Sequence, residues 1–300
     1  MSDIVVLGSA NMDLVVRQPR LPHPGETMFG SSFDTVPGGK GLNQAIAAAR
    51  VGGDVAFLGA VGADPFGSAL RETLAGAGVD VAGLARVARP TGTAHISVLD
   101  GAENAIVVVP GANGVELPLD DGQRSAILSA RYLVVQFERP MALVAAAVAF
   151  ARANGVTTVV TPAPVRPLPR GFLDAVDILV PNAAEACELA GVDDETDAAL
   201  RLSGRVGTVV VTRGSRGALV ARGGSIVAEV AAHPVTPVDT TGAGDTFTGV
   251  LVARLAAGDT EPAALRAASV AAALATTRPG ASPSMPTWRE VAPLLESPLS

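Results

Sequence analysis

The chain is poor in cysteine and in aromatic residues. Cys187 is the only cysteine among 300 residues, which excludes a disulfide framework and a cysteine-based metal cluster. Aromatic residues make up 3% of the sequence, whereas hydrophobic residues as a whole make up 48%. The core must therefore be built mainly from alanine, valine and leucine, which suits helices packed against a parallel sheet.

Long apolar runs and a secretory signal are also missing. The longest apolar run, Met141–Ala151, has 11 residues, which is too short to span a bilayer and is typical of a buried helix. The N-terminus passes directly into the strand-like segment Ile4–Leu7, without a charged and apolar leader before it. We therefore expect no membrane association and a cytoplasmic location.

Positive charge is scarce and scattered. The net charge is −7 at pH 7, and Lys40 is the only lysine, so all other basic side chains apart from histidine are arginines. No basic stripe and no run of mixed basic and aromatic residues is present, which argues against a nucleic-acid partner. The single lysine draws attention to the glycine-rich segment around it, Pro37–Gln44.

What the chain does contain is a regular alternation of strand-like and helix-like segments. This alternation predicts an α/β fold in which a mostly parallel sheet has helices on both faces. No repeat, low-complexity linker or second core is evident, so we expect residues 1–300 to form one domain. Strands are predicted at 4–7, 55–60, 132–136, 156–160, 178–180 and 208–212, followed by a hairpin at 218–220 and 226–230. A first helix is predicted to open within Pro37–Gln44 and to run through Arg50. Further helices are predicted at 65–77, 119–130, 140–154, 168–175, 183–190, 246–257 and 262–277, with a short helix after Pro286.

Two β-rich insertions interrupt the alternation. Residues 12–36 are rich in proline and glycine and are consistent with a pair of strands outside the main sheet. Residues 91–109 contain two β-rich runs on either side of Asp100-Gly101, which is a hairpin signal. Together the insertions predict a small second sheet that acts as a lid.

The most informative stretch runs from Val238 to Gly258. Gly242 and Gly244 allow backbone N–H groups to converge at the start of an apolar helix, where the helix dipole favours negative charge. Asp245 stands in the same turn, where a carboxylate can take a proton from an attacking hydroxyl. The alternative is that Asp245 only caps the helix after a glycine turn.

Polar residues also follow the carboxyl ends of several predicted strands, the edge at which α/β sheets bind ligands. Any one of them is more often a turn or a helix cap, but several on one edge favour a binding site. The segment Pro37–Gln44 is not a P-loop, because the spacing is wrong and no Ser or Thr follows Lys40. The residues at the strand ends are Asn11, Asp13, Gln136, Glu138, Asn182, Glu185 and Thr212–Gly217.

These segments resemble the ribokinase-like (PfkB-type) carbohydrate kinase family over essentially the whole chain. Two specific motifs, Gly38-Gly-Lys-Gly-x-Asn-Gln44 and Asp239-Thr-Thr-Gly-Ala-Gly-Asp-Thr-Phe247, carry the resemblance. It implies a three-layer sandwich with a small β-sheet lid, and ATP-dependent phosphoryl transfer to a pentose hydroxyl, with O5 of D-ribose as the expected acceptor. Shorter matches lie at Gly8–Asp13, Pro24–Thr27, Thr161–Pro164 and Thr212–Gly217.

The resemblance also implies roles for individual residues and a homodimer formed through the lid. Asp245 would be the general base, beside an anion hole formed by Gly242, Ala243 and Gly244. The sugar site would consist of Asn11, Asp13, Gly39, Lys40, Asn43, Glu138 and Asp245. The nucleotide site would consist of Asn182, Thr212, Gly214, Ser215, Gly217, Gly244 and Ser269. Glu185 would hold Mg²⁺ through water, and a K⁺ activator would bind at Asp239, Thr241, Ala275, Arg278, Gly280 and Ser284.

The sequence departs from the family pattern without losing a catalytic group. Leu42 stands where a small residue is usual, Thr161 where asparagine is common, and Ala183 where an acidic residue is frequent, so substrate preference stays open. The alternatives are a kinase of the same fold for a nucleoside, fructose or a deoxy sugar, and a sugar sensor without catalysis. Asp245 argues against a sensor, and the lack of aromatic and of paired basic residues in the expected sugar site disfavours a nucleoside and a phosphosugar.

Overall fold

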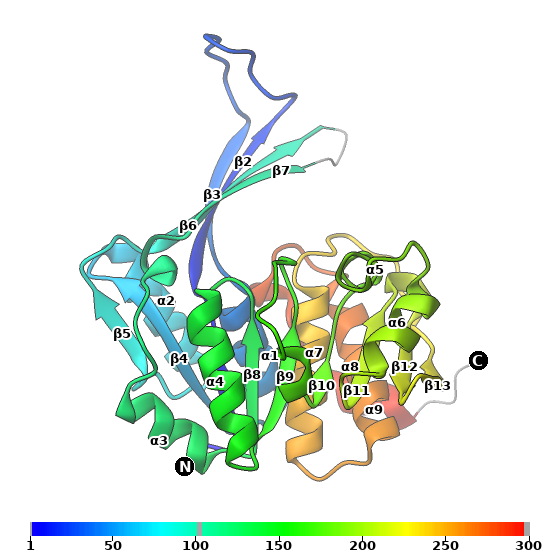
Figure 1. Cartoon of the computed structure of the whole chain (residues 1–300). Helices are drawn as coiled ribbons and strands as arrows, with labels where there is room; N and C mark the ends of the chain where they lie inside the picture. Colours follow the sequence, from blue (N-terminus) through cyan, green and yellow to red (C-terminus); the bar gives the residue numbers. More distant parts are fainter. Residues whose placement is uncertain (1, 101–103, 297–300) are drawn as a thin grey trace.

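The computed structural model describes residues 2–100 and 104–296, and its central feature is a nine-stranded sheet (Figure 1). The strand order is β13-β12-β11-β10-β9-β8-β1-β4-β5. All neighbours from β5 to β11 pair in parallel, and β12 and β13 add an antiparallel edge. The strands are β1 (Ile4–Leu7), β4 (Val55–Gly62), β5 (Leu84–Val87), β8 (Tyr132–Gln136), β9 (Thr157–Thr161), β10 (Ile178–Leu179), β11 (Thr208–Thr212), β12 (Ala218–Arg222) and β13 (Ser225–Val230).

Helices cover both faces of this sheet, which gives the predicted three layers. Alternate side chains of β1 enter different cores: Ile4 and Val6 pack in one hydrophobic cluster, and Val5 and Leu7 pack in the other. The first cluster includes residues of α1 (Lys40–Arg50), α2 (Pro65–Gly76), α7 (Ala243–Ala256), α8 (Glu261–Ala275) and α9 (Trp288–Glu296). The second includes residues of α3 (Asp121–Ser129), α4 (Met141–Ala153), α5 (Ala183–Ala190) and α6 (Glu195–Ser203).

Side-chain caps explain where several helices begin. Asp64 accepts a hydrogen bond from the Gly67 N–H and caps α2. Asp120 and Asn182 form capping boxes at α3 and α5, and Asp194 accepts from two backbone N–H groups at the start of α6. Each cap satisfies N–H groups that have no partner within the helix. Helix α7 differs, because it begins at Gly242 without a side-chain cap.

A second, four-stranded sheet rises from the body of the molecule (Figure 1). Its order is β3-β2-β6-β7, from β2 (Asn11–Gln18), β3 (Ser32–Gly38), β6 (Gly92–Leu99) and β7 (Asn104–Val109). We call this sheet with its connections the lid. The predicted strand pairs are therefore present, although Gly101 of the predicted turn lies outside the described residues.

The predicted helix at 168–175 is wrong. This segment forms only a 3-10 turn at Leu173–Ala175, because Pro167 and Pro169 lack N–H donors and Gly171 has φ 80°. Helix α6 and strand β5 were not predicted from the sequence. Helix α7 begins at Ala243, three residues before the predicted start at Thr246.

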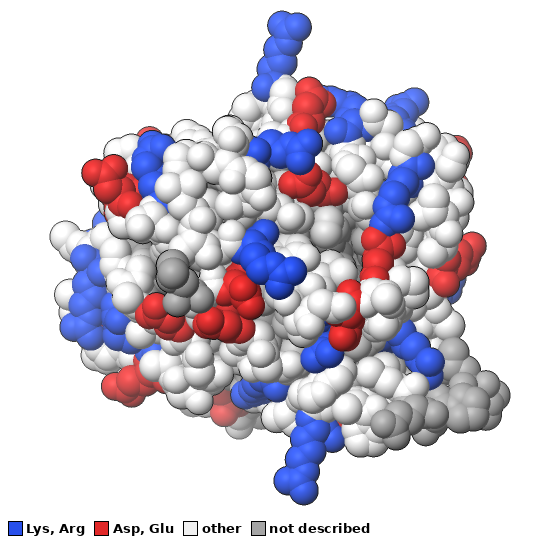
Figure 2. All heavy atoms as spheres, turned by 90° about the horizontal axis from the view of Figure 1, so that it is seen from below, with Lys and Arg blue, Asp and Glu red and all other residues white. Residues whose placement is uncertain are grey.

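The surface seen from below carries acidic and basic side chains intermixed (Figure 2). On this face the basic side chains do not gather into a stripe. In the part of the chain that the structure describes, no helix is both long and apolar enough to cross a membrane.

Candidate active site

Asp245 lies in the first turn of α7, where the chain leaves the left-handed conformation of Gly242 (φ 76°). Its side chain is only 7% exposed. Oδ2 accepts a hydrogen bond from Asn43 Nδ2, and Oδ1 accepts one from Gln44 Nε2, both at 3.0 Å. The carboxylate is therefore held by α1 from outside its own helix, which counts against the interpretation that it only caps α7.

A buried chain of amides supports the Asp245 carboxylate. Gln44 is fully buried, and its Oε1 accepts a hydrogen bond of 2.6 Å from Gln136 Nε2. Gln44 Nε2 also donates to Thr161 Oγ1 at 3.2 Å. Thr161, one of the departures from the family pattern, thus joins this network. Gln44 was not among the predicted site residues, although it belongs to the glycine-rich motif that contains Asn43.

Asp13, Glu138 and Asp245 lie near enough for the charges of Glu138 and Asp245 to act on Asp13, and we call these three residues the carboxylate cluster. Burial, followed by the charges of Glu138 and Asp245, raises the pKa of Asp13 from 3.8 to about 7. The Asp245 carboxylate raises the pKa of Lys40 against the opposing effect of burial, with further contributions from Glu138 and Glu185. The single lysine therefore balances several carboxylates, as a buried charge requires.

The loop that carries Lys40 is fixed by Glu138 and shaped by glycine. Glu138 Oε2 accepts hydrogen bonds from the Ser9 hydroxyl and from the Lys40 N–H, the latter at 3.0 Å. A Cβ on Gly38 would lie 2.2 Å from Asp13 Oδ2, so only glycine leaves room for this carboxylate. Gly39 directly precedes α1 and has φ 94°.

A small cavity of about 140 Å³ opens beside these residues. Asn11 and Glu138, both predicted for the sugar site, line it. Asn113 also lines it and donates from Nδ2 to Asn11 Oδ1 at 2.8 Å. The remaining lining residues are Val108, Pro110, Pro164 and Arg166.

The two other polar residues of this lining, Asn113 and Arg166, were not among the predicted site residues. Asn113 lies in a 3-10 turn after the lid, and Arg166 lies in a proline-rich loop, so no local motif marks either of them. Arg166 adds a basic side chain to the wall of the small cavity.

A larger cavity of about 530 Å³ reaches the start of α7. Its walls are largely apolar, and Ala243 and Gly244 form part of the lining. No atom lies within 4 Å of the position that a Cβ on Gly244 would take, so this backbone faces open space. Most of the predicted nucleotide residues line the cavity: Thr212, Gly214, Ser215, Gly217, Gly244 and Ser269.

The other wall of the large cavity was not predicted. It comes from residues 232–237, including Ala232, His233, Pro234 and Val235, which have no regular secondary structure and no recognisable motif. Asn182, predicted for the nucleotide site, is not among the lining residues. Its side chain caps α5, and its backbone forms a parallel bridge with Thr212.

Glu185 could support a magnesium ion only together with other ligands. Its Oε2 accepts a hydrogen bond of 2.9 Å from the Asn182 N–H. Within the described residues, no group of three His, Cys, Asp or Glu side chains could hold a metal ion.

The residues predicted to bind K⁺ lie on two segments joined by Asp239. Its carboxylate accepts hydrogen bonds from the Thr241 N–H at 2.9 Å and from the Gly280 N–H at 2.8 Å. Burial raises the pKa of Asp239, but hydrogen bonds from the Thr241 side chain and from the Gly280 and Thr241 N–H groups outweigh it and lower the pKa below its usual value. Arg278 pairs through its side chain with Glu290, which leaves its backbone carbonyl as the potential ligand. Ala275 and Ser284 are both buried on the second segment.

The site therefore combines a large cavity that ends at a helix N-terminus with a smaller cavity whose lining includes Asn11, Asn113 and Glu138, beside a carboxylate cluster. This is the arrangement of an enzyme that brings a phosphorylated ligand and a polar acceptor together. The chain belongs to the pfkB family of carbohydrate kinases, whose model matches residues 1–288.

Individual relatives agree with this membership. The chain is 38% identical over 301 residues to a ribokinase of Haemophilus influenzae, covering 98% of each chain. It is 39% identical over 297 residues to a ribokinase of Bacillus subtilis, covering 98% of this chain and all of the relative. Among solved structures, that of Arabidopsis thaliana ribokinase complexed with ribose and ATP matches with a TM-score of 0.93 and 32% identity, covering 99% of each chain.

Proposed function

We propose that the protein is an ATP-dependent sugar kinase that transfers the γ-phosphoryl group to O5 of D-ribose and forms ribose 5-phosphate. The observation that carries this proposal is the place of Asp245, at the helix N-terminus reached by the large cavity and within the carboxylate cluster beside the small one. The ribokinase relatives, one of them in complex with ribose and ATP, support the same assignment.

The proposed reaction is a direct transfer between two bound substrates. Asp245 takes the proton of the ribose O5 hydroxyl, O5 forms a bond to the γ-phosphorus, and the bond from that phosphorus to the bridging oxygen of ADP breaks. The N–H groups at Gly242, Ala243 and Gly244 stabilise the negative charge of the transferred group. Such transfers have a loose transition state, so positioning and charge neutralisation matter more than a strong base.

The sugar is proposed to bind through the polar groups of the small cavity and the carboxylate cluster. Asn43 supports this, because its buried Oδ1 has no hydrogen-bond partner in the described structure and can accept one from a sugar hydroxyl. Asn11, Asp13, Gly39, Lys40 and Glu138 complete the proposed set, and Arg166 lies at its edge. The nucleotide is proposed to occupy the large cavity, with Asn182 at the end of the neighbouring strand.

Two ions complete the proposal. Glu185 would hold a Mg²⁺ ion through water, and the ion would supply positive charge against the phosphates of the nucleotide. A K⁺ ion is proposed at Asp239, Thr241, Ala275, Arg278, Gly280 and Ser284. The carboxylate and carbonyl oxygens of these residues are the ligand type that suits a large, weakly hydrated cation. Asp239 supports this role because it ties the anion-hole segment to the loop after α8.

The lid is proposed to close over the sugar and to form a homodimer, as part of one domain spanning residues 1–300. Its exposed apolar side chains support a covered face in the assembled protein: Phe33 is 60% exposed and Val107 is 65% exposed. Large apolar side chains left exposed on a sheet can mark an interaction site. Cytoplasmic location stays a prediction from the sequence.

The decisive experiment measures ADP production from ATP with ribose, deoxyribose, fructose, fructose 6-phosphate and adenosine as acceptors. We expect ribose to give the highest kcat/KM and NMR to identify ribose 5-phosphate as the product. Equal or greater efficiency with adenosine or fructose 6-phosphate would refute the acceptor but keep the kinase. Sugar binding without any ATP turnover would instead favour a sensor.

A further inference from the structure

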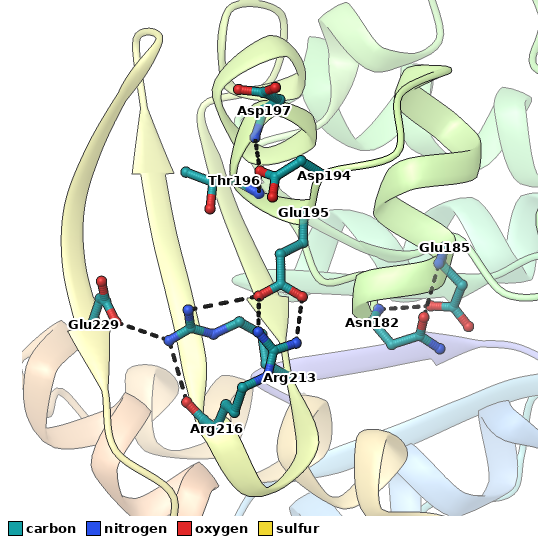
Figure 3. Close-up of polar contacts among 9 residues, drawn as sticks. All are labelled: Asn182, Glu185, Asp194, Glu195, Thr196, Asp197, Arg213, Arg216 and Glu229. Atoms are coloured by element: carbon teal, nitrogen blue, oxygen red, sulfur yellow. Dashed lines mark hydrogen bonds and ion pairs between the residues drawn. The ribbon is translucent and has the colours of Figure 1, made fainter.

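Two arginines on either side of a cavity-lining turn converge on one carboxylate. The turn is the 3-10 segment Gly214–Arg216 between β11 and β12. Arg216 donates from Nη1 and Nη2 to Oε1 and Oε2 of Glu195, at 2.7 and 2.6 Å. Nη1 of Arg213 lies 3.8 Å from Glu195 Oε1 (Figure 3). Glu195 itself is the first residue of α6, and the cap formed by Asp194 fixes that helix start.

The turn is also closed by its own hydrogen bonds. The Arg213 N–H donates to the Gly217 carbonyl at 2.7 Å, and the Gly217 N–H donates to the Gly214 carbonyl at 3.0 Å. Arg213 Nη2 donates to the Arg216 carbonyl at 3.2 Å. Gly214 and Ser215 therefore present their backbone to the large cavity from a loop whose two ends are tied to α6.

The inner part of this cluster is shielded from solvent. The side chains of Arg213 and Glu195 are 12% and 13% exposed, whereas that of Arg216 is 63% exposed. Arg213 Nε is buried without a hydrogen-bond partner, so the charge of this guanidinium depends on its carboxylate neighbours. Its second neighbour, Glu229, is 65% exposed. A shielded pair loses more than an exposed one when a partner is removed, because the remaining charge stays poorly solvated.

We propose that Glu195 is a positioning residue for nucleotide binding: it holds the turn Gly214–Arg216 in the shape that lines the large cavity. The proposal rests on the proposed function, since it takes the large cavity to be the nucleotide site. Glu195 touches neither cavity, so its effect passes through Arg213 and Arg216.

The expected signature is a loss of nucleotide affinity without a loss of sugar affinity. Freeing the turn adds conformations that must be lost again when the nucleotide binds. The residues of the carboxylate cluster lie on other elements and keep their contacts. We expect Glu195→Gln to raise the Kd for ADP and the KM for ATP by roughly 5–30-fold, the factor that one or two kcal/mol represents.

The experiment is titration calorimetry of ADP with the full-length protein, combined with the KM for ATP and for ribose and the Tm. Asp174→Asn is the matched control, because it breaks the exposed Arg205–Asp174 pair and leaves the turn intact. Arg216→Gln removes the bidentate contact with Glu195 through the more exposed partner. If Glu195→Gln does not fold, the Kd for ADP of Arg216→Gln tests the proposal in its place. Both changes break the Arg216–Glu195 contact, whereas only Glu195→Gln also weakens the Arg213–Glu195 pair, so the double variant should be no weaker in ADP binding than Glu195→Gln alone.

The outcomes separate this inference from the proposed function. Weaker ADP binding in both single variants, with unchanged ribose KM and an unchanged control, supports the inference. ADP affinity within twofold of wild type in a folded Glu195→Gln protein overturns it and leaves the kinase assignment intact. A wild-type protein that binds no ADP overturns both.

Discussion

Replacing Asp245 by asparagine removes the proposed general base while keeping its size. The structure indicates how the variant accommodates the amide. The amide oxygen of the new side chain at position 245 can keep the hydrogen bond from Gln44 Nε2. Gln44 cannot easily turn over, because its Oε1 already accepts a hydrogen bond from Gln136. The new amide nitrogen would face the Asn43 amide nitrogen, so two donors would meet.

Asn43 can relieve this conflict by turning its amide over. Its Oδ1 has no partner in the parent structure, so rotating it toward the new amide leaves Nδ2 unpaired in place of Oδ1. The number of unpaired groups is then unchanged. Two hydrogen bonds to a charge become neutral ones and weaken by about 1 kcal/mol each, and relief from burying a charge offsets part of this loss. The free energy of unfolding should therefore fall by less than about 2 kcal/mol.

The effect on catalysis should be much larger. Loss of a general base costs about 10²–10⁴ in rate, which corresponds to about 3–5 kcal/mol of activation free energy. We expect kcat of Asp245→Asn to fall by that factor, with the Kd for ADP within about threefold of wild type. Steady-state kinetics, ADP calorimetry and urea unfolding measure the three quantities.

Asp121→Asn provides the matched control, because it makes the same change in the first turn of α3, where the side chain is exposed. It should leave kcat unchanged. A folded Asp245→Asn enzyme with near-normal kcat would refute the role of Asp245 as base. A fall in the free energy of unfolding of Asp245→Asn well above about 2 kcal/mol would refute the idea that the Asn43 amide turns over to accept from the new side chain.

Three further predictions concern the acceptor, pH and the cation. Asp13→Ala should raise the ribose KM and lower kcat/KM while ADP affinity stays within about threefold, because a site built to bond a hydroxyl discriminates through that bond; an unchanged ribose KM would contradict this. The folded protein keeps a proton on Asp13 up to about pH 7, whereas the unfolded chain loses it near 3.8, so the stability contributed by this group is complete below about pH 4 and is lost as pH rises through about 7. Urea unfolding should therefore show that the free energy of unfolding falls less between pH 5 and pH 8 in Asp13→Asn than in wild type. An equal fall in both proteins would count against a raised pKa of Asp13. Finally, activity at equal ionic strength should be higher in K⁺ than in Na⁺ or tetramethylammonium, and Asp239→Asn should reduce the difference; equal rates with all three cations would exclude the proposed K⁺ site.

The sequence was most informative where function depends on a short continuous segment. The motif around Gly242–Asp245 was recognisable because an anion site at a helix start needs glycines that free the backbone N–H groups, and the proposed base follows within a few residues. The alternation of apolar strands and helices likewise predicted the central sheet and its two covered faces. The residues predicted for the nucleotide lie together for the same reason, since most of them follow strand ends or begin helices.

The features that were missed depend on contacts between distant segments. Asn113 reaches Asn11 across 102 positions of the sequence, and Gln44 reaches Asp245 across 201. Neither distance can be read from local spacing. The segment 168–175 was predicted as a helix from its apolar residues, but its prolines and Gly171 decide the outcome. Metal ligation, dimerisation and the role of each site residue stay predictions.

The path of β2 and β3 has a consequence for the modularity of this enzyme. Strand β2 starts with Asn11 and Asp13 and continues into the lid, and β3 returns from the lid to Gly38, directly before α1 with Lys40 and Asn43. The same two strands therefore form part of the lid and carry or lead into residues proposed for the sugar site. A chimera that exchanges the lid between relatives at the base of these strands would also exchange Asn11 and Asp13. Such a chimera is therefore expected to change the proposed sugar contacts together with the lid. Only exchanges confined to the outer connection between Gln18 and Ser32 would change the lid alone.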